Sequence, residues 1–198
     1  MTCNSAEIWT IFLAPLIGLP MPLLPIHILW INLVTDGLPG IALASEKAER
    51  DIMNLPPRNP SESLFAKGIA YHILWVGLLM AGITLGVQAW AINAGLDHWQ
   101  TMVFTVLSLT QLGHVLSIRS DREFLFQQGI FTNTPLLGAV LLTGGLQLMV
   151  IYLPLANEIF HTQPLSLNEL GICVGASALL FHAVEFEKWL KGKFNQNK

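Results

Sequence analysis

Six long runs of apolar residues divide the chain, and short segments rich in polar residues, proline or glycine separate them. A membrane-spanning helix needs about 20 mostly apolar residues, which these runs approach or exceed. The pattern therefore predicts an all-α, polytopic membrane helix bundle that forms one domain over residues 1–198. The predicted spans are residues 2–18, 23–44, 68–93, 99–117, 135–155 and 167–189.

Proline and glycine mark the ends of the spans and one close contact. The run Gly18-Leu-Pro-Met-Pro22 cannot continue a helix and predicts a tight hairpin between the first two spans. Gly82 and Gly86 form a GxxxG step in the third span, where close approach of another helix is expected.

The composition supports a lipid bilayer as the surroundings of this chain. Hydrophobic residues make up 53% and charged residues 12%, against about 25% charged residues in ordinary soluble domains. A net charge of -3 with ten Lys and Arg residues leaves no basic face for nucleic acid. Two distant cysteines, Cys3 and Cys173, suggest neither a disulfide framework nor a zinc site.

The basic residues predict how the bundle is oriented. They fall in three segments: Lys47, Arg50, Arg58 and Lys67; Arg119 and Arg122; and Lys188, Lys191, Lys193 and Lys198. The alternate segments, residues 19–22, 94–98 and 156–166, contain no Lys or Arg. Because basic loops stay on the cytoplasmic side, both termini are expected to be cytoplasmic.

Glu7 and Asp36 are the clear cases of acidic residues inside predicted spans, where a charged side chain costs several kcal/mol and usually has a function. Glu7 shares one face of the first helix with Asn4, three residues away. Asp36 shares one face of the second helix with Asn32 and Thr35. If the hairpin makes these helices neighbours, the two polar faces meet inside the bundle.

Such a cluster offers oxygen ligands only. Oxygen ligands suit a hard cation such as Ca²⁺, and Na⁺, Mg²⁺ or Mn²⁺ would also fit. Gly37 and Pro39 would weaken the second helix and free backbone carbonyls. Gln111 in the fourth span offers a further neutral oxygen, and His114 is interpreted as a packed histidine. The alternative is a hydrogen-bond network that only holds the two helices together.

Two segments resemble a known family. Residues 25–39, Pro-Ile-His-Ile-Leu-Trp-Ile-Asn-Leu-Val-Thr-Asp-Gly-Leu-Pro, resemble the sixth transmembrane helix of P-type calcium-pumping ATPases. Residues 51–58, Asp-Ile-Met-Asn-Leu-Pro-Pro-Arg, resemble the cytoplasmic loop after it, which couples the membrane bundle to the phosphorylation domain. With the six-span pattern, the chain resembles the C-terminal membrane region of such a pump, helices five to ten, with helix five shortened at its start.

The resemblance implies a set of metal ligands for the transported Ca²⁺, with Mn²⁺ as the other candidate ion. The implied ligands on helices five and six are Asn4, Glu7, Asn32, Thr35 and Asp36. Gln111 aligns with a helix-eight site residue that is Glu in reticulum-type pumps, which puts a second ion site in doubt.

The family's phosphorylated Asp-Lys-Thr-Gly-Thr motif is not in this sequence, so no catalytic residue is assigned. We therefore expect an ion-binding portion that does not hydrolyse ATP alone, with ATP and Mg²⁺ needed only in the complete pump. Its partners would be the lipid bilayer and the N-terminal pump domains, in cis or in trans. The alternatives are a stand-alone membrane binding or regulatory subunit and a non-functional truncated remnant. The short outer loops suit a bacterial-type plasma membrane.

Overall fold

The computed structural model describes residues 1–46, 65, 68–119, 125 and 129–195, and every element in this part of the chain is helical. The α-helices are α1 (Thr2–Leu16), α2 (Pro25–Trp30), α3 (Gly37–Leu43), α4 (Ile69–Asn93), α5 (Trp99–Ser117), α7 (Thr134–Tyr152), α8 (Pro154–Phe160) and α9 (Leu167–Asn195). A π-helix, η1 (Ile31–Asp36), joins α2 to α3, and a 3-10 turn, η3 (Ile130–Thr132), precedes α7. The predicted all-α class is confirmed.

Each of the six predicted spans corresponds to one helix or to one continuous helical run, since α2, η1 and α3 follow one another without a gap. Four of these segments are long and apolar enough to cross a membrane, namely Pro25–Leu43, Ile69–Asn93, Thr134–Tyr152 and Leu167–Leu190. With 15 residues, α1 is shorter than the hydrocarbon core requires, and α5 is rich in Thr, Ser and Gln. The count of six spans therefore stays a prediction. The loop at residues 51–58 lies outside the described residues.

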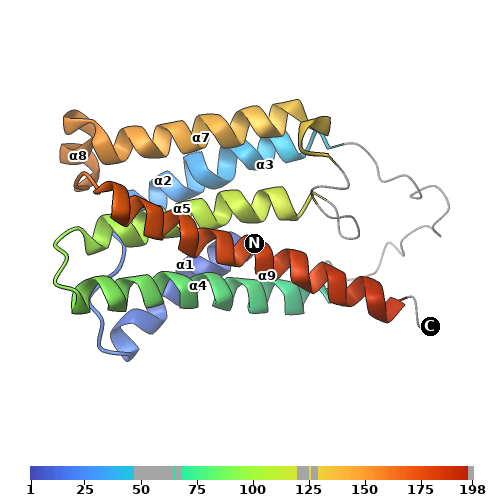
Figure 1. Ribbon diagram of the computed structural model, residues 1–198, viewed down its shortest axis with the longest axis horizontal. Helices are drawn as coiled ribbons and strands as arrows, with labels where there is room; N and C mark the ends of the chain where they lie inside the picture. The colour runs from blue at the N-terminus through green and yellow to red at the C-terminus, as the bar shows by residue number, and fades with distance from the viewer. Residues whose placement is uncertain (47–64, 66–67, 120–124, 126–128, 196–198) are drawn as a thin grey trace.

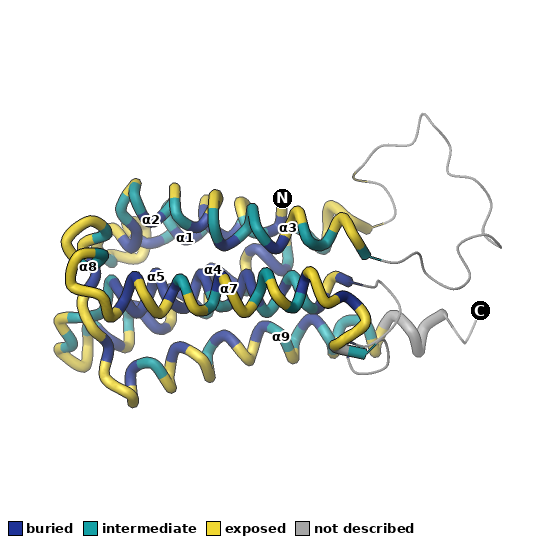
Figure 2. Tube along the Cα trace, turned by 90° about the horizontal axis from the view of Figure 1, so that it is seen from above, coloured by how far each residue is buried: buried dark blue, intermediate teal, exposed yellow. Residues whose placement is uncertain are grey.

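Helix α5 lies in the middle of the bundle. It packs against α4, α7, α9 and η1, and more than half of its side chains are buried. Figure 2 shows α1 and the α2–α3 run on one side of α4, α5 and α7, with α9 on the other side. A central helix has protein rather than lipid around it, which explains why α5 tolerates polar side chains.

The first two predicted spans make fewer contacts with each other than expected. α1 packs mainly along α4, whereas α3 packs on α7. The connection is not a tight hairpin, because Gly18 turns with a positive φ of 79° and residues 19–24 then run without helical structure. The Gln88 side chain of α4 donates a hydrogen bond of 2.8 Å to the Pro20 carbonyl, which anchors this segment to α4.

The distribution of side chains is typical of a protein in lipid. Large apolar side chains such as Phe12, Leu141 and Leu179 are exposed on the outside of the bundle. Polar ones such as Thr84 and Gln111 are buried inside it. In a bilayer, polar groups gain from burial among other polar groups, so this arrangement fits the predicted environment.

The ends of the helices agree with the predicted orientation. Arg119, just after α5, lies at the same end of the bundle as the C-terminal end of α9 (Figure 1). The segments without Lys or Arg lie at the opposite end. That the basic end faces the cytoplasm remains a prediction.

Among the described glycines, the tightest contact with another helix is at Gly77, not at the predicted GxxxG step. A Cβ atom at Gly77 would lie 2.6 Å from the Ser5 hydroxyl and 2.9 Å from its Cβ. A Cβ atom at Gly82 or Gly86 would have no neighbour within 4 Å in the part of the chain that the structure describes. The expectation for Gly82 and Gly86 is therefore wrong, and Gly77 is the position where α4 touches α1.

Replacing Gly77 with alanine is expected to destabilise the bundle by about 1–3 kcal/mol, because the new methyl group overpacks the α1–α4 contact. The matched change Gly82→Ala should be neutral or slightly stabilising, since alanine favours a helix over glycine. Unfolding of both variants in detergent, followed by circular dichroism, measures the difference. Equal stability of the two variants would show that α1 does not pack tightly at Gly77.

Candidate cation site

Glu7 is the centre of the candidate site. Only 4% of this residue is exposed, and its carboxylate joins three segments of the chain. One oxygen accepts a hydrogen bond of 2.8 Å from Nδ2 of Asn32 in η1. The other accepts one of 3.2 Å from Nε2 of Gln111 in α5. The structure thus brings together three of the predicted site residues, from α1, η1 and α5.

Asp36 lies on the same side of η1 as Asn32, next to the start of α1. Its carboxylate is half-buried and lies close to the Cys3 thiol. Asp36 also interacts electrostatically with Glu7. Sequence reasoning left Cys3 out of the site, although it lies four residues before Glu7 and therefore on the same face of α1.

Local helix geometry separates Thr35 from its two neighbours. Thr35 is 2% exposed and faces the interior with Ile31, whereas Asn32 lies at the surface of η1 toward α1. A π-turn contains more residues than an α-turn, so residues three apart no longer share a face. The prediction that Asn32, Thr35 and Asp36 share one face is therefore wrong for Thr35.

The second predicted helix changes its geometry before Gly37 without breaking. It widens into η1 and continues as α3. Pro39 has no N–H group to donate to the carbonyl four residues earlier, that of Thr35. A π-helical segment beside a proline is a known way to absorb such a missing bond. The helix therefore stays continuous past Asp36.

Asn4 is a further predicted site residue that the structure does not bring into the cluster. It is exposed on α1, whereas Glu7 is buried. Gln111 is 1% exposed, and its side-chain oxygen has no partner among the described residues. His114 is 2% exposed and stacks on His72 with ring centres 5.7 Å apart, which fits its interpretation as a packed histidine.

The side chains that could coordinate an ion determine which kind of cation the site would bind. No group of three His, Cys, Asp or Glu side chains with metal-binding geometry occurs among the residues that the structure describes. A cation at this place would meet two carboxylates, from Glu7 and Asp36, neutral amide oxygens and at most one sulfur atom, that of Cys3. This set fits a hard cation and does not fit a soft one such as Cu⁺.

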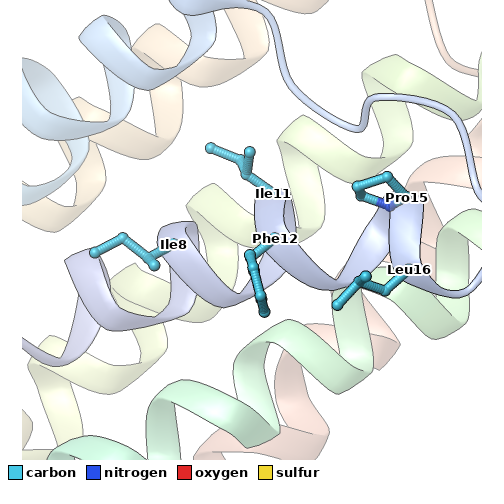
Figure 3. A pocket seen from close by; sticks show the side chains of 5 residues that line it. All are labelled: Ile8, Ile11, Phe12, Pro15 and Leu16. Atoms are coloured by element: carbon cyan, nitrogen blue, oxygen red, sulfur yellow. The ribbon is translucent and has the colours of Figure 1, made fainter.

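A hollow on the surface of the described residues lies away from this site. It has a volume of about 440 Å³ and lies along the outer face of α1, lined by Ile8, Ile11, Phe12, Pro15 and Leu16 (Figure 3). All five side chains are hydrocarbon, so this hollow offers no ligand to an ion.

A second polar cluster connects the ends of three helices by hydrogen bonds. The Arg119 guanidinium donates hydrogen bonds of 2.9 and 3.0 Å to the Glu46 carboxylate. It also donates to the Gly129 carbonyl at 3.1 Å and to the Thr132 hydroxyl at 2.6 Å. Asn133 donates to Glu46 at 2.8 Å and caps α7 through the Leu136 N–H. This junction links the ends of α3 and α5 to the start of α7.

A comparison with known protein families agrees with the sequence pattern. A family model described as "Cation transporting ATPase, C-terminus" matches residues 20–190. The chain belongs to this family. It is a multi-pass membrane protein, and the predicted relationship to the C-terminal region of P-type calcium-transporting ATPases is confirmed.

Two relatives show the extent of the similarity. The Calcium-transporting ATPase of Bacillus subtilis (strain 168) is 39% identical over 182 residues, which cover 90% of this chain and 20% of the relative. The Calcium-transporting ATPase 1 of Bacillus cereus (strain ATCC 10987 / NRS 248) is 35% identical over 189 residues, which cover 86% of this chain and 21% of the relative. The chain spans about a fifth of the length of these relatives.

Proposed function

We propose that this chain is the cation-binding membrane portion of a P-type pump that transports Ca²⁺. The observation that carries the proposal is the buried Glu7 carboxylate, which meets amide groups from η1 and α5 inside a membrane bundle. The names of the Bacillus relatives support Ca²⁺ as the cargo. They also favour a bacterial plasma membrane over an internal one.

Glu7 and Asp36 would supply the negative charge that a dehydrated divalent cation requires. Ca²⁺ takes 6–8 oxygen ligands at 2.3–2.6 Å in flexible geometry. The Asn32 and Gln111 amides now donate N–H groups to Glu7. For the cation to bind, each amide would turn and present its oxygen, so that donors to the carboxylate become ligands to the ion. Mn²⁺ would be accepted less well, because it favours fewer ligands in a tighter octahedron.

The complete transport cycle would need more than this chain. ATP and Mg²⁺ would act on N-terminal pump domains, present in cis or in trans, that carry the phosphorylated aspartate. Phosphorylation there would tilt α1 and the α2–α3 run relative to α5 and separate the ligands. We expect no ATP hydrolysis by this chain alone.

A binding test on the chain itself separates this function from the two alternatives. The chain is purified in lipid nanodiscs, stripped of metal with EGTA, and titrated with ⁴⁵Ca²⁺ in buffers that set the free Ca²⁺ concentration. A site built by the chain gives saturable binding, and Mn²⁺ competes for it. Saturable binding would oppose a regulatory subunit that works only through its loops. It would equally oppose a remnant with no working site.

The substitution Glu7→Gln is expected to weaken Ca²⁺ binding about tenfold, or about 1.4 kcal/mol, because a charged ligand becomes a neutral one. The matched control is Glu158→Gln, the same change at an exposed position on α8, which should leave the affinity unchanged. Unaltered affinity and stoichiometry in Glu7→Gln would mean that Glu7 serves only to join helices. No binding by the wild-type chain would overturn the proposal.

A further inference from the structure

Another pocket opens on the outside of the bundle, between the start of α4 and the later turns of α9. It has a volume of about 300 Å³, and we call it the α4–α9 pocket. The residues that line it come from these two helices: Tyr71, Trp75, Ala183, Phe186, Glu187 and Leu190. None of them belongs to the candidate cation site.

The α4–α9 pocket lies where the two helices reach the end of their apolar spans. These spans are Ile69–Asn93 and Leu167–Leu190. Tyr71 is in the first turn of one span, and Leu190 is the last residue of the other. Figure 1 shows both of these span ends at the same end of the bundle. The pocket is therefore at the depth where lipid headgroups meet acyl chains, which is also where Trp and Tyr are enriched.

Aromatic rings form the walls of the α4–α9 pocket. Tyr71 and Phe186 are exposed at the surface, and Trp75 is partly buried between the two helices. The Phe186 ring stacks on Trp189 with ring centres 5.6 Å apart. The face of an aromatic ring carries partial negative charge and attracts a cation within about 6 Å. These walls therefore favour a ligand that is apolar or positively charged.

Glu187 adds a negative charge to these walls. It is the charged residue among the described residues that line the pocket, and its side chain is 13% exposed. Its Oε2 atom accepts a hydrogen bond of 2.9 Å from the Trp75 indole N–H and lies 3.1 Å from Nδ1 of His72. The indole N–H can only donate, so this contact stabilises the negative charge and fixes the carboxylate in the pocket wall.

A fixed carboxylate beside aromatic faces recognises an ammonium group. The rings attract the cation through their faces, and the carboxylate accepts charge-assisted hydrogen bonds from its N–H groups. An anionic headgroup would be repelled by Glu187. The pocket thus has the charge and the surface that fit a primary ammonium group.

The surface next to the pocket indicates that a lipid carries this group. Leu78 lies three residues after Trp75 on α4, and Leu179 lies four residues before Ala183 on α9, so each continues the pocket face into the span. Leu78 and Leu179 are 39% and 64% exposed. An acyl chain can therefore lie along this apolar surface while the headgroup occupies the pocket.

We propose that the α4–α9 pocket binds the primary ammonium headgroup of an aminophospholipid. Glu187 is the counter-charge, and Tyr71, Trp75 and Phe186 surround the ammonium group. The bound lipid joins α4 to α9 at one end of the bundle. This site does not use Glu7 or Asp36, so the proposal holds whether or not the chain binds Ca²⁺.

Native mass spectrometry of the full chain tests the proposal. The chain is released from nanodiscs that contain equal amounts of phosphatidylethanolamine and phosphatidylglycerol with identical acyl chains, and the retained lipids are counted. The wild type should retain phosphatidylethanolamine with a preference of about tenfold. Glu187→Gln keeps an oxygen that can accept from Trp75 but removes the charge, so it should abolish this preference. Phe186→Leu removes one ring and should lower the preference about threefold.

Two matched controls make the same changes outside the pocket. Glu158 is exposed on α8, and Phe131, in η3, is 78% exposed. Glu158→Gln and Phe131→Leu should keep the wild-type preference. Because Phe186 is at the surface, Phe186→Leu tests the pocket even if Glu187→Gln does not fold.

Four results would overturn the proposal. The first is equal retention of the two lipids by the wild type, and the second is an unchanged preference in folded Glu187→Gln or in Phe186→Leu. The third is complete displacement of phosphatidylethanolamine by free ethanolamine, which would assign the pocket to soluble amines. The fourth is a dimer of the chain that Phe186→Leu dissociates, since a second copy would then cover the pocket in place of a lipid.

Discussion

Replacing Asp36 with asparagine is expected to abolish Ca²⁺ binding by the chain in nanodiscs, with an affinity loss of more than about 100-fold, or about 2.7 kcal/mol. Asp36 and Glu7 are the two carboxylates at the candidate site. Removing one leaves a divalent cation with half of its counter-charge in surroundings of low dielectric constant. Asp36 is expected to matter more than Glu7, because Glu7 is already occupied by two amide donors.

Equilibrium ⁴⁵Ca²⁺ binding measures this loss. The matched control is Asp97→Asn, the same change at an exposed residue. Asp97 lies in the segment between α4 and α5, at the end of the bundle opposite to the end of α3. Asp97→Asn should bind Ca²⁺ like the wild type. If Asp36→Asn also binds normally, the two-carboxylate site is refuted.

In a pump completed with its N-terminal domains, the same Asp36→Asn change should abolish Ca²⁺-dependent phosphorylation by ATP. Phosphorylation by inorganic phosphate, which does not require bound Ca²⁺ in such a cycle, should remain. Loss of both reactions would point to misfolding instead of a missing ligand.

Hydrophobic patterning predicted the helices well because the bilayer imposes a length on them. α5, for example, was predicted at residues 99–117 and observed at Trp99–Ser117. The pattern says nothing about which helices touch. The contact of Gly77 with Ser5 depends on how α1 and α4 approach in space, and GxxxG spacing alone pointed to Gly82 instead.

The candidate site was also predicted only in part. Glu7, Asn32 and Gln111 meet as the sequence suggested, because a buried carboxylate in a bundle must find donors. Thr35 departs from the prediction because helical spacing was counted at 3.6 residues per turn, and η1 has a wider turn. Asn4 lies on α1 outside the cluster, since a spacing of three places two residues near each other without making both buried.

The Arg119 junction had no signature in the sequence, since its members are far apart along the chain. Glu46 and Arg119 are 73 residues apart and form a two-point ion pair with side chains 14% and 1% exposed. Removing the guanidinium by Arg119→Met is expected to destabilise the bundle by about 3–5 kcal/mol, as breaking one side of a buried ion pair does. Thermal and denaturant unfolding in detergent measure the loss.

The comparison with a more exposed pair makes this prediction specific. His98 lies 3.1 Å from Glu169, and its side chain is 37% exposed, so His98→Gln should cost less than about 1 kcal/mol.

Adding Glu46→Gln to Arg119→Met should recover part of the loss, because the Glu46 carboxylate, which has lost its cationic partner, is then replaced by a neutral amide. If the double variant is no more stable than Arg119→Met, the cost comes from lost packing of the long Arg119 side chain rather than from charge. Because the junction joins the ends of the helices that carry Asp36 and Gln111, recovery of stability should be accompanied by recovery of Ca²⁺ affinity.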